Sequence, residues 1–342
     1  MTHPYQDLPE RHFWRTAVAD PAADDVDPVW DVPFTLGRTD RVAAAGSCFA
    51  QHISRFLVQE GYNYLVTEAT ADGGHPAFPA RFGNLYTVRQ LLQLFHRAHG
   101  TFRPSVRAWP VGDRFIDPFR PQIPKEGFVS EAALLDEADR HLAAVREMFK
   151  KADVFIFTLG LTETWENMDD GAVVPVAPGV VGATASDNYR FRNLTVPEME
   201  ADLAAFVTAL RLVNPRVRLI LTVSPVPLVA SYAGHVLTAT TYSKSALRVV
   251  CETARRQIAN LAYFPSYEII TGVHNKGRFF EENLRSVSAD GVAHVMATFQ
   301  KHFLGAASGE AESTPAAPPA ARHAVDNPDA GDVICDEELL DA

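Results

Sequence analysis

The stretch Arg41-Val42-Ala43-Ala44-Ala45-Gly46-Ser47-Cys48-Phe49-Ala50 contains the features that decide the fold. Its first five residues form a short apolar run that suits a buried strand, and an amphipathic helix begins at Cys48. A strand that turns into a helix at Gly46-Ser47 places a hydroxyl at the carboxyl edge of a parallel sheet, where open α/β sheets hold their chemistry. Two interpretations of Ser47 follow. It is either an N-cap, or a nucleophile whose own N–H lies at a helix N-terminus and is ready to bind an oxyanion.

Strands and helices alternate along the rest of the chain. The predicted strands are 41–45, 63–66, 154–159, 217–223 and 261–264, and the predicted helices are 48–60, 87–99, 130–151, 195–213, 242–260 and 288–303. The runs 154–159 and 217–223 are apolar on both faces, which is typical of central parallel strands. The pattern therefore predicts an α/β fold, a doubly wound and mainly parallel five-stranded sheet with helices on both faces.

Four segments fall outside this alternation. Residues 1–40 contain prolines, Trp14 and Trp30, and we expect an irregular arm that packs over the domain at a sheet edge. The loop at 68–86 is long enough to be functional. Residues 101–129 predict an ordered excursion with a short hairpin that roofs a pocket, and 162–194 predict a polar loop.

The C-terminal segment has a different composition. Residues 305–342 are rich in Ala, Pro and acidic side chains without periodicity, so we expect a disordered tail after a single domain at 1–304. The tail holds nine acidic residues against one arginine, so its charge is −8 of the total of −11. The remaining −3 gives no electrostatic footprint for nucleic acid. A short motif at 333–340 is the one candidate for binding a partner protein.

Several other classes of protein lack support in the sequence. No run approaches the roughly 18 apolar residues of a membrane span, and the polar start at residues 1–7 is not a signal peptide, so we expect a cytoplasmic protein. Cys48, Cys251 and Cys335 have neither metal nor disulfide spacing, and Cys251 suits a buried helix face. Phosphate-binding and dinucleotide-binding glycine motifs are absent, so we expect no cofactor and no metal.

A series of short sequence words resembles one known family. They run in order from about Pro4 to about Phe303: Gly46-Ser47-Cys48-Phe49-Ala50, Phe82-Gly83-Asn84-Leu85-Tyr86-Thr87, Asp117-Pro118-Phe119-Arg120-Pro121, Thr158-Leu159-Gly160-Leu161-Thr162-Glu163-Thr164-Trp165, Ser224-Pro225-Val226-Pro227-Leu228 and Tyr263-Phe264-Pro265-Ser266-Tyr267-Glu268. The chain resembles the GSCFA family, a branch of the SGNH (GDSL-like) hydrolases. The resemblance implies a flavodoxin-like three-layer sandwich. It also implies a serine esterase or O-acyltransferase that acts on small acyl esters, in particular acetyl groups on a carbohydrate.

The resemblance also implies roles for residues. Ser47 would form the acyl-enzyme, Gly83 would be the oxyanion glycine of the second block, and Asn84 would add a side-chain N–H. The third block of such enzymes carries an asparagine, whereas this chain has Gly160-Leu161-Thr162-Glu163. We therefore take Gly160, Thr162 and Glu163 as binding candidates without the usual amide. Glu166 is a further candidate for the site. The alternative is that Glu163 and Glu166 lie in a solvated loop and have no role in the site.

The general base is the main departure from the resemblance. SGNH enzymes take it from an Asp-x-x-His near the C-terminus, where this chain has Asn283 and Ser286. His294 is our first candidate for the base, because Asp290 lies four residues before it on the same predicted helix face. A histidine that simply lies on the helix surface is the alternative.

Other residues remain as alternatives for the chemistry. His235 and His274 lie in predicted loops and are further candidates for the base. Lys244 could be a base of the Ser/Lys kind, but it lies near the start of a predicted helix, where a lysine is usually a solvated charge. Cys48 is a second candidate nucleophile, because a helix N-terminus lowers thiol pKa values. The competing class is a non-catalytic relative that binds a glycan or a partner protein, which the missing Asp-x-x-His favours.

Overall fold

The computed structural model describes residues 3–69, 77–181, 188–305 and 339. At its centre is a parallel sheet of β1 (Val42–Gly46), β4 (Val154–Leu159), β8 (Arg218–Val223) and β9 (Leu261–Phe264), in the order β1-β4-β8-β9. The predicted α/β fold with a parallel sheet is confirmed. The tail motif at 333–340 apart from residue 339, Cys335, and residues 70–76 of the predicted loop at 68–86 lie outside the described residues.

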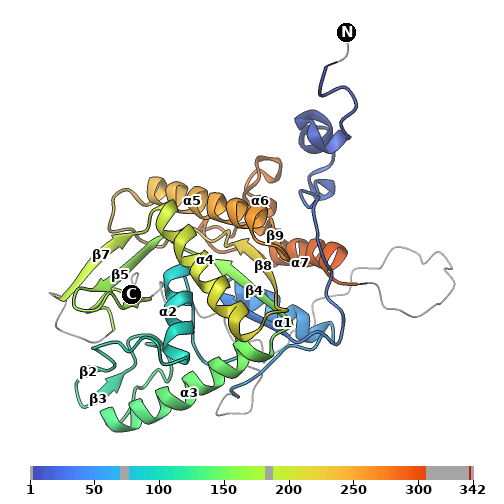
Figure 1. Ribbon diagram of the computed structural model, residues 1–342. Helices are drawn as coiled ribbons and strands as arrows, with labels where there is room; N and C mark the ends of the chain where they lie inside the picture. The colour runs from blue at the N-terminus through green and yellow to red at the C-terminus, as the bar shows by residue number, and fades with distance from the viewer. Residues whose placement is uncertain (1–2, 70–76, 182–187, 306–338, 340–342) are drawn as a thin grey trace.

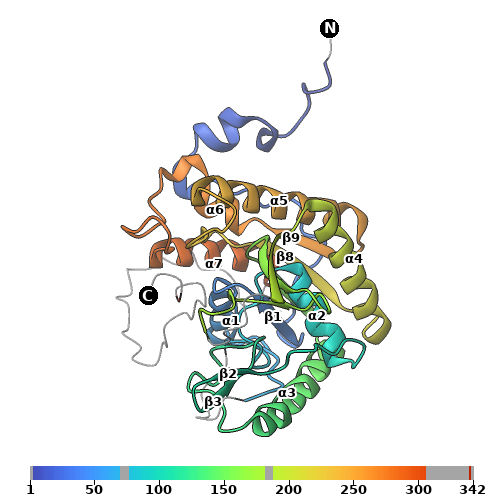
Figure 2. The same ribbon diagram turned by 90° about the vertical axis from the view of Figure 1, so that its left-hand side faces the viewer.

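Helices cover both faces of this sheet (Figures 1 and 2). The described α-helices are α1 (Ala50–Gln59), α2 (Val88–Ala98), α3 (Glu131–Lys151), α4 (Val196–Val213), α5 (Val236–Gln257), α6 (Ser266–Thr271) and α7 (Ala289–Phe303). Capping boxes form at Thr87 with Gln90 and at Thr195 with Glu198, and Ser288 caps α7 through the Gly291 N–H. These local signals place the helix starts close to where the sequence predicts them.

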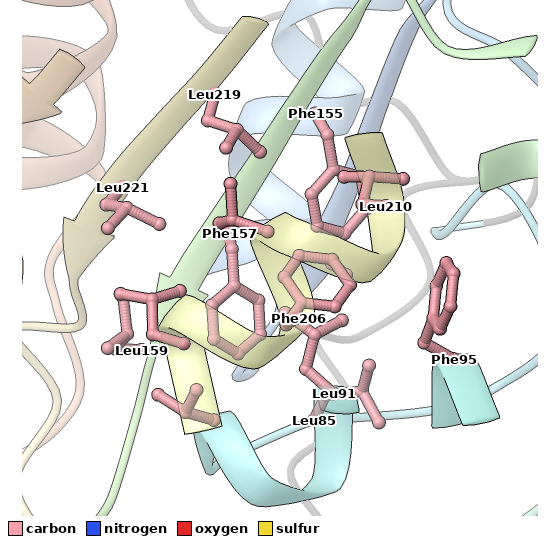
Figure 3. Close-up of a cluster of buried hydrophobic side chains, with 14 of the residues drawn as sticks. Leu85, Leu91, Phe95, Phe155, Phe157, Leu159, Phe206, Leu210, Leu219 and Leu221 are labelled. Carbon is pink, nitrogen blue, oxygen red and sulfur yellow. The ribbon is translucent and has the colours of Figure 1, made fainter. Parts of the chain in front are cut away.

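The core has two halves because each strand alternates its side chains between the faces. Phe155, Phe157, Leu219 and Leu221 point toward α2, α3, α4 and α5, where Phe206 joins them (Figure 3). The intervening residues of the same strands pack with α1, α6 and α7 on the opposite face. The strands are thus buried on both sides, as their continuous apolar runs predict.

The fifth predicted strand is reduced to a single bridge. Residue Tyr64 pairs in parallel with Val42 at the free edge of β1, held by backbone hydrogen bonds of Val42 N to Asn63 O and of Leu65 N to Val42 O. After Leu65 the backbone turns away, and the Thr67 N–H donates to Pro79 O instead. The sheet therefore has four strands in the described part of the chain.

The predicted polar loop at 162–194 is wrong in its described part, which forms a second sheet. β5 (Glu163–Asn167) lies between β6 (Val173–Val174) and β7 (Tyr189–Asn193), all antiparallel. Its polar residues pair across strands, since the buried Glu166 forms ion pairs with Arg190 and Arg192. The predicted hairpin is confirmed as β2 (Trp109–Val111) with β3 (Arg114–Ile116).

The N-terminal arm contacts the domain with only part of its length. Leu36 bridges Leu304, and Asp27 pairs with Lys301 and His302 on α7. Within the described residues, no hydrogen bond or ion pair joins 3–21 to the rest, and this segment projects away from the domain (Figures 1 and 2). The expectation that the arm packs over the domain thus holds only for its second half. Among the helices the structure describes, none combines the length and apolarity needed to cross a bilayer.

Candidate active site

The turn after β1 brings Ser47 against β4. Gly46 has a φ of 141°, and a Cβ on it would lie 2.3 Å from the Thr158 carbonyl oxygen, so only glycine fits there. The next N–H, that of Ser47, donates to the same Thr158 oxygen at 3.1 Å. This N–H continues the ladder between the strands, which corrects our expectation that it is available to an oxyanion.

The Ser47 hydroxyl neither caps a helix nor bonds to another described residue. The residue is 3% exposed, and its Oγ makes no hydrogen bond to any described residue. The helix α1 starts three residues later, with Phe49 at its N-cap and no side-chain cap. The N-cap interpretation of Ser47 is therefore wrong. A buried hydroxyl without a partner costs about 1–3 kcal/mol, which fits a group reserved for a ligand.

Two loops meet at this turn. Leu85 N donates to Gly46 O at 2.8 Å, and the N–H groups of Gly160 and Leu161 donate to Tyr86 O at 2.9 and 3.0 Å. A Cβ on Gly160 would lie 3.0 Å from the Ser47 Cβ. The sequence words at 46–50, 82–87 and 158–165 thus converge, as the resemblance implies, but the Gly160 N–H is already engaged.

The candidates Gly83 and Asn84 lie on the same loop, next to α1. Asn84 is buried, and its Oδ1 accepts from Gln51 Nε2 at 3.4 Å, one helical turn beyond Ser47. Gly83 has a φ of 71°, a left-handed conformation that suits the turn interpretation of this pair. Gly83, Asn84 and Gln51 together border a cavity of about 230 Å³.

The excursion at 101–129 supplies the other wall of this cavity, as the sequence predicts. Its segment 119–124 faces Phe78 and Phe82 across the cavity. Arg120 holds this wall in place through ion pairs with Asp117, at 2.7 Å, and with Glu137. Burial alone would raise the pKa of Asp117, but the charges of Arg120 and Arg97 hold that pKa below its ordinary value.

Thr162 and Glu163 fasten loops together. The Thr162 hydroxyl donates to Asn193 Oδ1 at 2.7 Å on β7. Glu163 accepts from Ser231 Oγ at 2.6 Å and from Tyr232 N at 3.3 Å, and it borders a second cavity of about 200 Å³. Glu166 lies on β5 as a buried, ion-paired carboxylate, so its interpretation as part of a solvated loop is wrong.

None of the three candidate histidines hydrogen-bonds to Ser47. The His294 ring stacks on Phe279 with 5.1 Å between ring centroids, and no hydrogen bond or ion pair joins it to Asp290 within the described chain. Burial, followed by the charges of His294 and Arg278, lowers the pKa of His274, so these two histidines are neighbours. The catalytic role of His294 stays a prediction.

His235 and the turn at 283–286 have local structural roles. The exposed His235 caps α5, where its Nδ1 accepts from Leu237 N at 3.2 Å. Asn283 donates to Ser286 Oγ at 2.9 Å and accepts from Ser286 N at 2.9 Å. Beside them, Arg285 Nε donates to Pro227 O at 3.2 Å, so the turn adjoins the loop after β8. Cys48 is buried and in no disulfide, and it remains an alternative nucleophile.

Lys244 is the residue that the sequence analysis misplaced. The helix α5 starts at Val236, six residues before the predicted start, so Lys244 lies in its third turn. The side chain is 1% exposed, and its Nζ donates to Gly160 O at 2.7 Å. A signal was present, because Leu247 and Cys251 follow Lys244 at helical spacing and mark a buried face.

The site belongs to a recognisable class of protein. The chain is an open α/β protein with a parallel sheet, and such sheets bind ligands beyond the carboxyl ends of their strands, where the buried Ser47 lies after β1. The sequence profile of the GSCFA family matches residues 41–299. This chain belongs to the GSCFA family.

Other comparisons add little. Curated protein sequences gave no match. Among solved structures, an acetyl esterase mutant with an acetate ion aligns with a TM-score of 0.35 at 11% identity, over 77% of this chain and 95% of that one. A carbohydrate esterase of family 3 from Talaromyces cellulolyticus aligns with a TM-score of 0.34, at the same identity and coverage. The similarity of both is too low to bear on the site. In the described part of the chain, no cluster of His, Cys, Asp and Glu could hold a metal ion.

Proposed function

We propose that this protein is an SGNH-like serine ester hydrolase or O-acyltransferase that acts on small acyl esters, in particular acetyl esters of a carbohydrate. The observation that carries the proposal is the Ser47 hydroxyl, which is buried at the carboxyl edge and has no hydrogen-bond partner among the described residues. Membership of the GSCFA family supports the same chemistry.

The proposed reaction has two halves. Ser47 Oγ attacks the acyl carbon and passes its proton to a base, and the alkoxide of the leaving alcohol takes up that proton when the ester C–O bond breaks. Water, or a sugar hydroxyl in a transferase, then attacks the acyl-enzyme in the same way. We assign the Gly83 N–H and the Asn84 side chain to the developing oxyanion, because that loop adjoins the Ser47 turn.

The cavity of about 230 Å³ is our proposed site for the substrate. It is bordered by Gly83 and Asn84, and Phe78, Phe82 and Ile123 give it an apolar interior. Such a lining suits the acyl group, with the alcohol of the ester directed toward solvent.

Covalent labelling tests this function. We expect a fluorophosphonate to label the purified protein at Ser47, identified by peptide mass spectrometry, and we expect the label to block hydrolysis of p-nitrophenyl acetate. Ser47→Ala should lose both signals, and Cys48→Ala should keep them. Labelling that depends on Cys48 instead would move the nucleophile to the thiol.

A second function is favoured by a specific observation. No histidine hydrogen-bonds to Ser47, and the turn at Asn283 and Ser286 holds neither an aspartate nor a histidine. A relative without catalysis would use the same cavity to bind a glycan or a partner protein. Absence of both labelling and turnover in folded wild-type protein would favour this alternative.

A further inference from the structure

The Lys244 side chain lies in the protein interior, where lysine is rarely found. Its side chain is 1% exposed, and it lies on the face of α5 that packs into the domain with Leu247 and Cys251. Lysine is almost never fully buried unless its nitrogen has a defined polar partner. Here Nζ donates to the Gly160 carbonyl oxygen at 2.7 Å.

The loop that Lys244 contacts is the one packed against Ser47. A Cβ placed on Gly160 would lie only 3.0 Å from the Ser47 Cβ. The Gly160 backbone therefore packs directly against the Ser47 side chain. The neighbouring Ser243 fixes the same loop, since its Oγ accepts from Thr162 N at 3.1 Å. Ser243 and Lys244 of α5 therefore both bind the loop that follows β4. The Lys244 nitrogen lies at Gly160, the residue that packs against the Ser47 side chain.

We propose that Lys244 is the general base that activates Ser47, an assignment that rests on the proposed function. The neutral amine donates one N–H to Gly160 O and offers its lone pair to the Ser47 hydroxyl. Removing an amine from water disfavours its charged form in general, and the neutral form is the one that a base needs. The hydrogen bond between the two side chains forms when substrate is bound, because catalytic hydrogen bonds often tighten only in the complex.

The proton balance is complete within the pair and the substrate. As Ser47 Oγ bonds to the acyl carbon, its proton moves to Lys244 Nζ. The resulting ammonium returns the proton to the alcohol oxygen when the ester C–O bond breaks. In the second half, the amine takes a proton from the attacking water and gives it back to Ser47 Oγ when the acyl-enzyme bond breaks.

The candidate histidines are placed less well for this role. His294 stacks on Phe279 and neighbours His274, on the side of the sheet covered by α7. His235 is engaged as the cap of α5. No hydrogen bond joins any of the three candidate histidines to Ser47 among the described residues.

Two substitutions separate a base from a structural tether. Lys244→Arg keeps a donor for Gly160 O, but a guanidinium stays protonated and cannot accept the Ser47 proton. Lys244→Met keeps the apolar length of the chain and removes the nitrogen. General-base catalysis contributes about 10²–10⁴-fold, so we expect both variants to lose kcat by that factor with KM little changed.

The assay is hydrolysis of p-nitrophenyl acetate, with folding of each variant checked by thermal unfolding. Lys244→Arg with a kcat within threefold of wild type would overturn the assignment and make Lys244 a tether for Gly160. If Lys244→Met does not fold, Lys244→Arg alone decides the question. Loss of activity in His294→Gln, with Lys244→Arg active, would give the role of the base to His294.

The two levels of inference fail differently. If wild-type protein shows neither turnover nor fluorophosphonate labelling at Ser47, the proposed function fails and the role of Lys244 fails with it. If Ser47-dependent turnover is present and survives both Lys244 substitutions, the proposed function stands and only the assignment of the base is wrong.

Discussion

Replacing Ser47 with alanine removes one buried oxygen atom that makes no hydrogen bond to a described residue. At a helix N-cap this change would cost about 1 kcal/mol, but Ser47 does not cap α1. The alanine methyl group occupies the place of the Ser47 Cβ, so packing against Gly160 is unchanged. Because an unsatisfied buried hydroxyl costs about 1–3 kcal/mol, we expect the free energy of unfolding to stay constant or to rise by up to that amount. Esterase activity should be lost in the same variant.

Ser54 offers a matched control within α1. Its hydroxyl is equally buried but lies 2.7 Å from Ala77 O and 2.9 Å from Gln51 O, so Ser54→Ala should lower the free energy of unfolding by about 1 kcal/mol. Urea unfolding followed by far-UV circular dichroism compares the two variants. If Ser47→Ala is destabilised as much as Ser54→Ala, the Ser47 hydroxyl has a structural partner and the reasoning is refuted.

Three further predictions concern the turn, the cavity and a half-buried histidine. Gly46→Ala should prevent folding, because the new Cβ would lie 2.3 Å from Thr158 O. The control Gly37→Ala, whose Cβ would have its nearest neighbour at 3.5 Å, should fold normally. Soluble yield and melting temperature measure the effect of both substitutions. Ile123→Trp should fill the cavity of about 230 Å³ and raise KM for p-nitrophenyl butyrate more than for the acetate, and an equal effect on both esters would argue against an acyl site there. Burial lowers the pKa of His52 to about 4, so the unfolded state binds more protons than the folded state between about pH 6.5 and 4. Stability should fall as the pH drops through that window, and His52→Leu should flatten this part of a urea-derived stability curve.

The features that the sequence predicts well depend on near neighbours in the chain. The capping box of Thr87 with Gln90 needs only four residues, and the strand Val154–Leu159 is identified by its own continuous apolar run. The turn at Gly46 is equally local, since one glycine between a strand and a helix identifies it. Such signals carry over directly into the fold.

The features that it misses depend on distant partners. β5 looks like a loop because Glu166 is polar, and its burial becomes understandable only with Arg190, which lies 24 residues further along the chain. Lys244 looks like a solvated charge because its partner, Gly160, lies 84 residues before it. The absence of a hydrogen bond at the Ser47 hydroxyl could not be predicted either, because the helix starts two residues later than a capping serine at position 47 requires.

The distribution of tryptophan gives this protein a useful optical property. All four tryptophans lie outside the central sheet and its helices: Trp14 and Trp30 are exposed in the arm, Trp109 is buried in the hairpin, and Trp165 lies on β5. Trp165 borders the cavity of about 200 Å³ and contacts the rings of Phe191 and Tyr232. Intrinsic fluorescence therefore reports on the arm and the two added sheets rather than on the core. Iodide should quench the exposed arm tryptophans, Trp14 and Trp30, before the others. The fluorescence that remains then includes that of Trp165, so a ligand that binds in the cavity at β5 should change it.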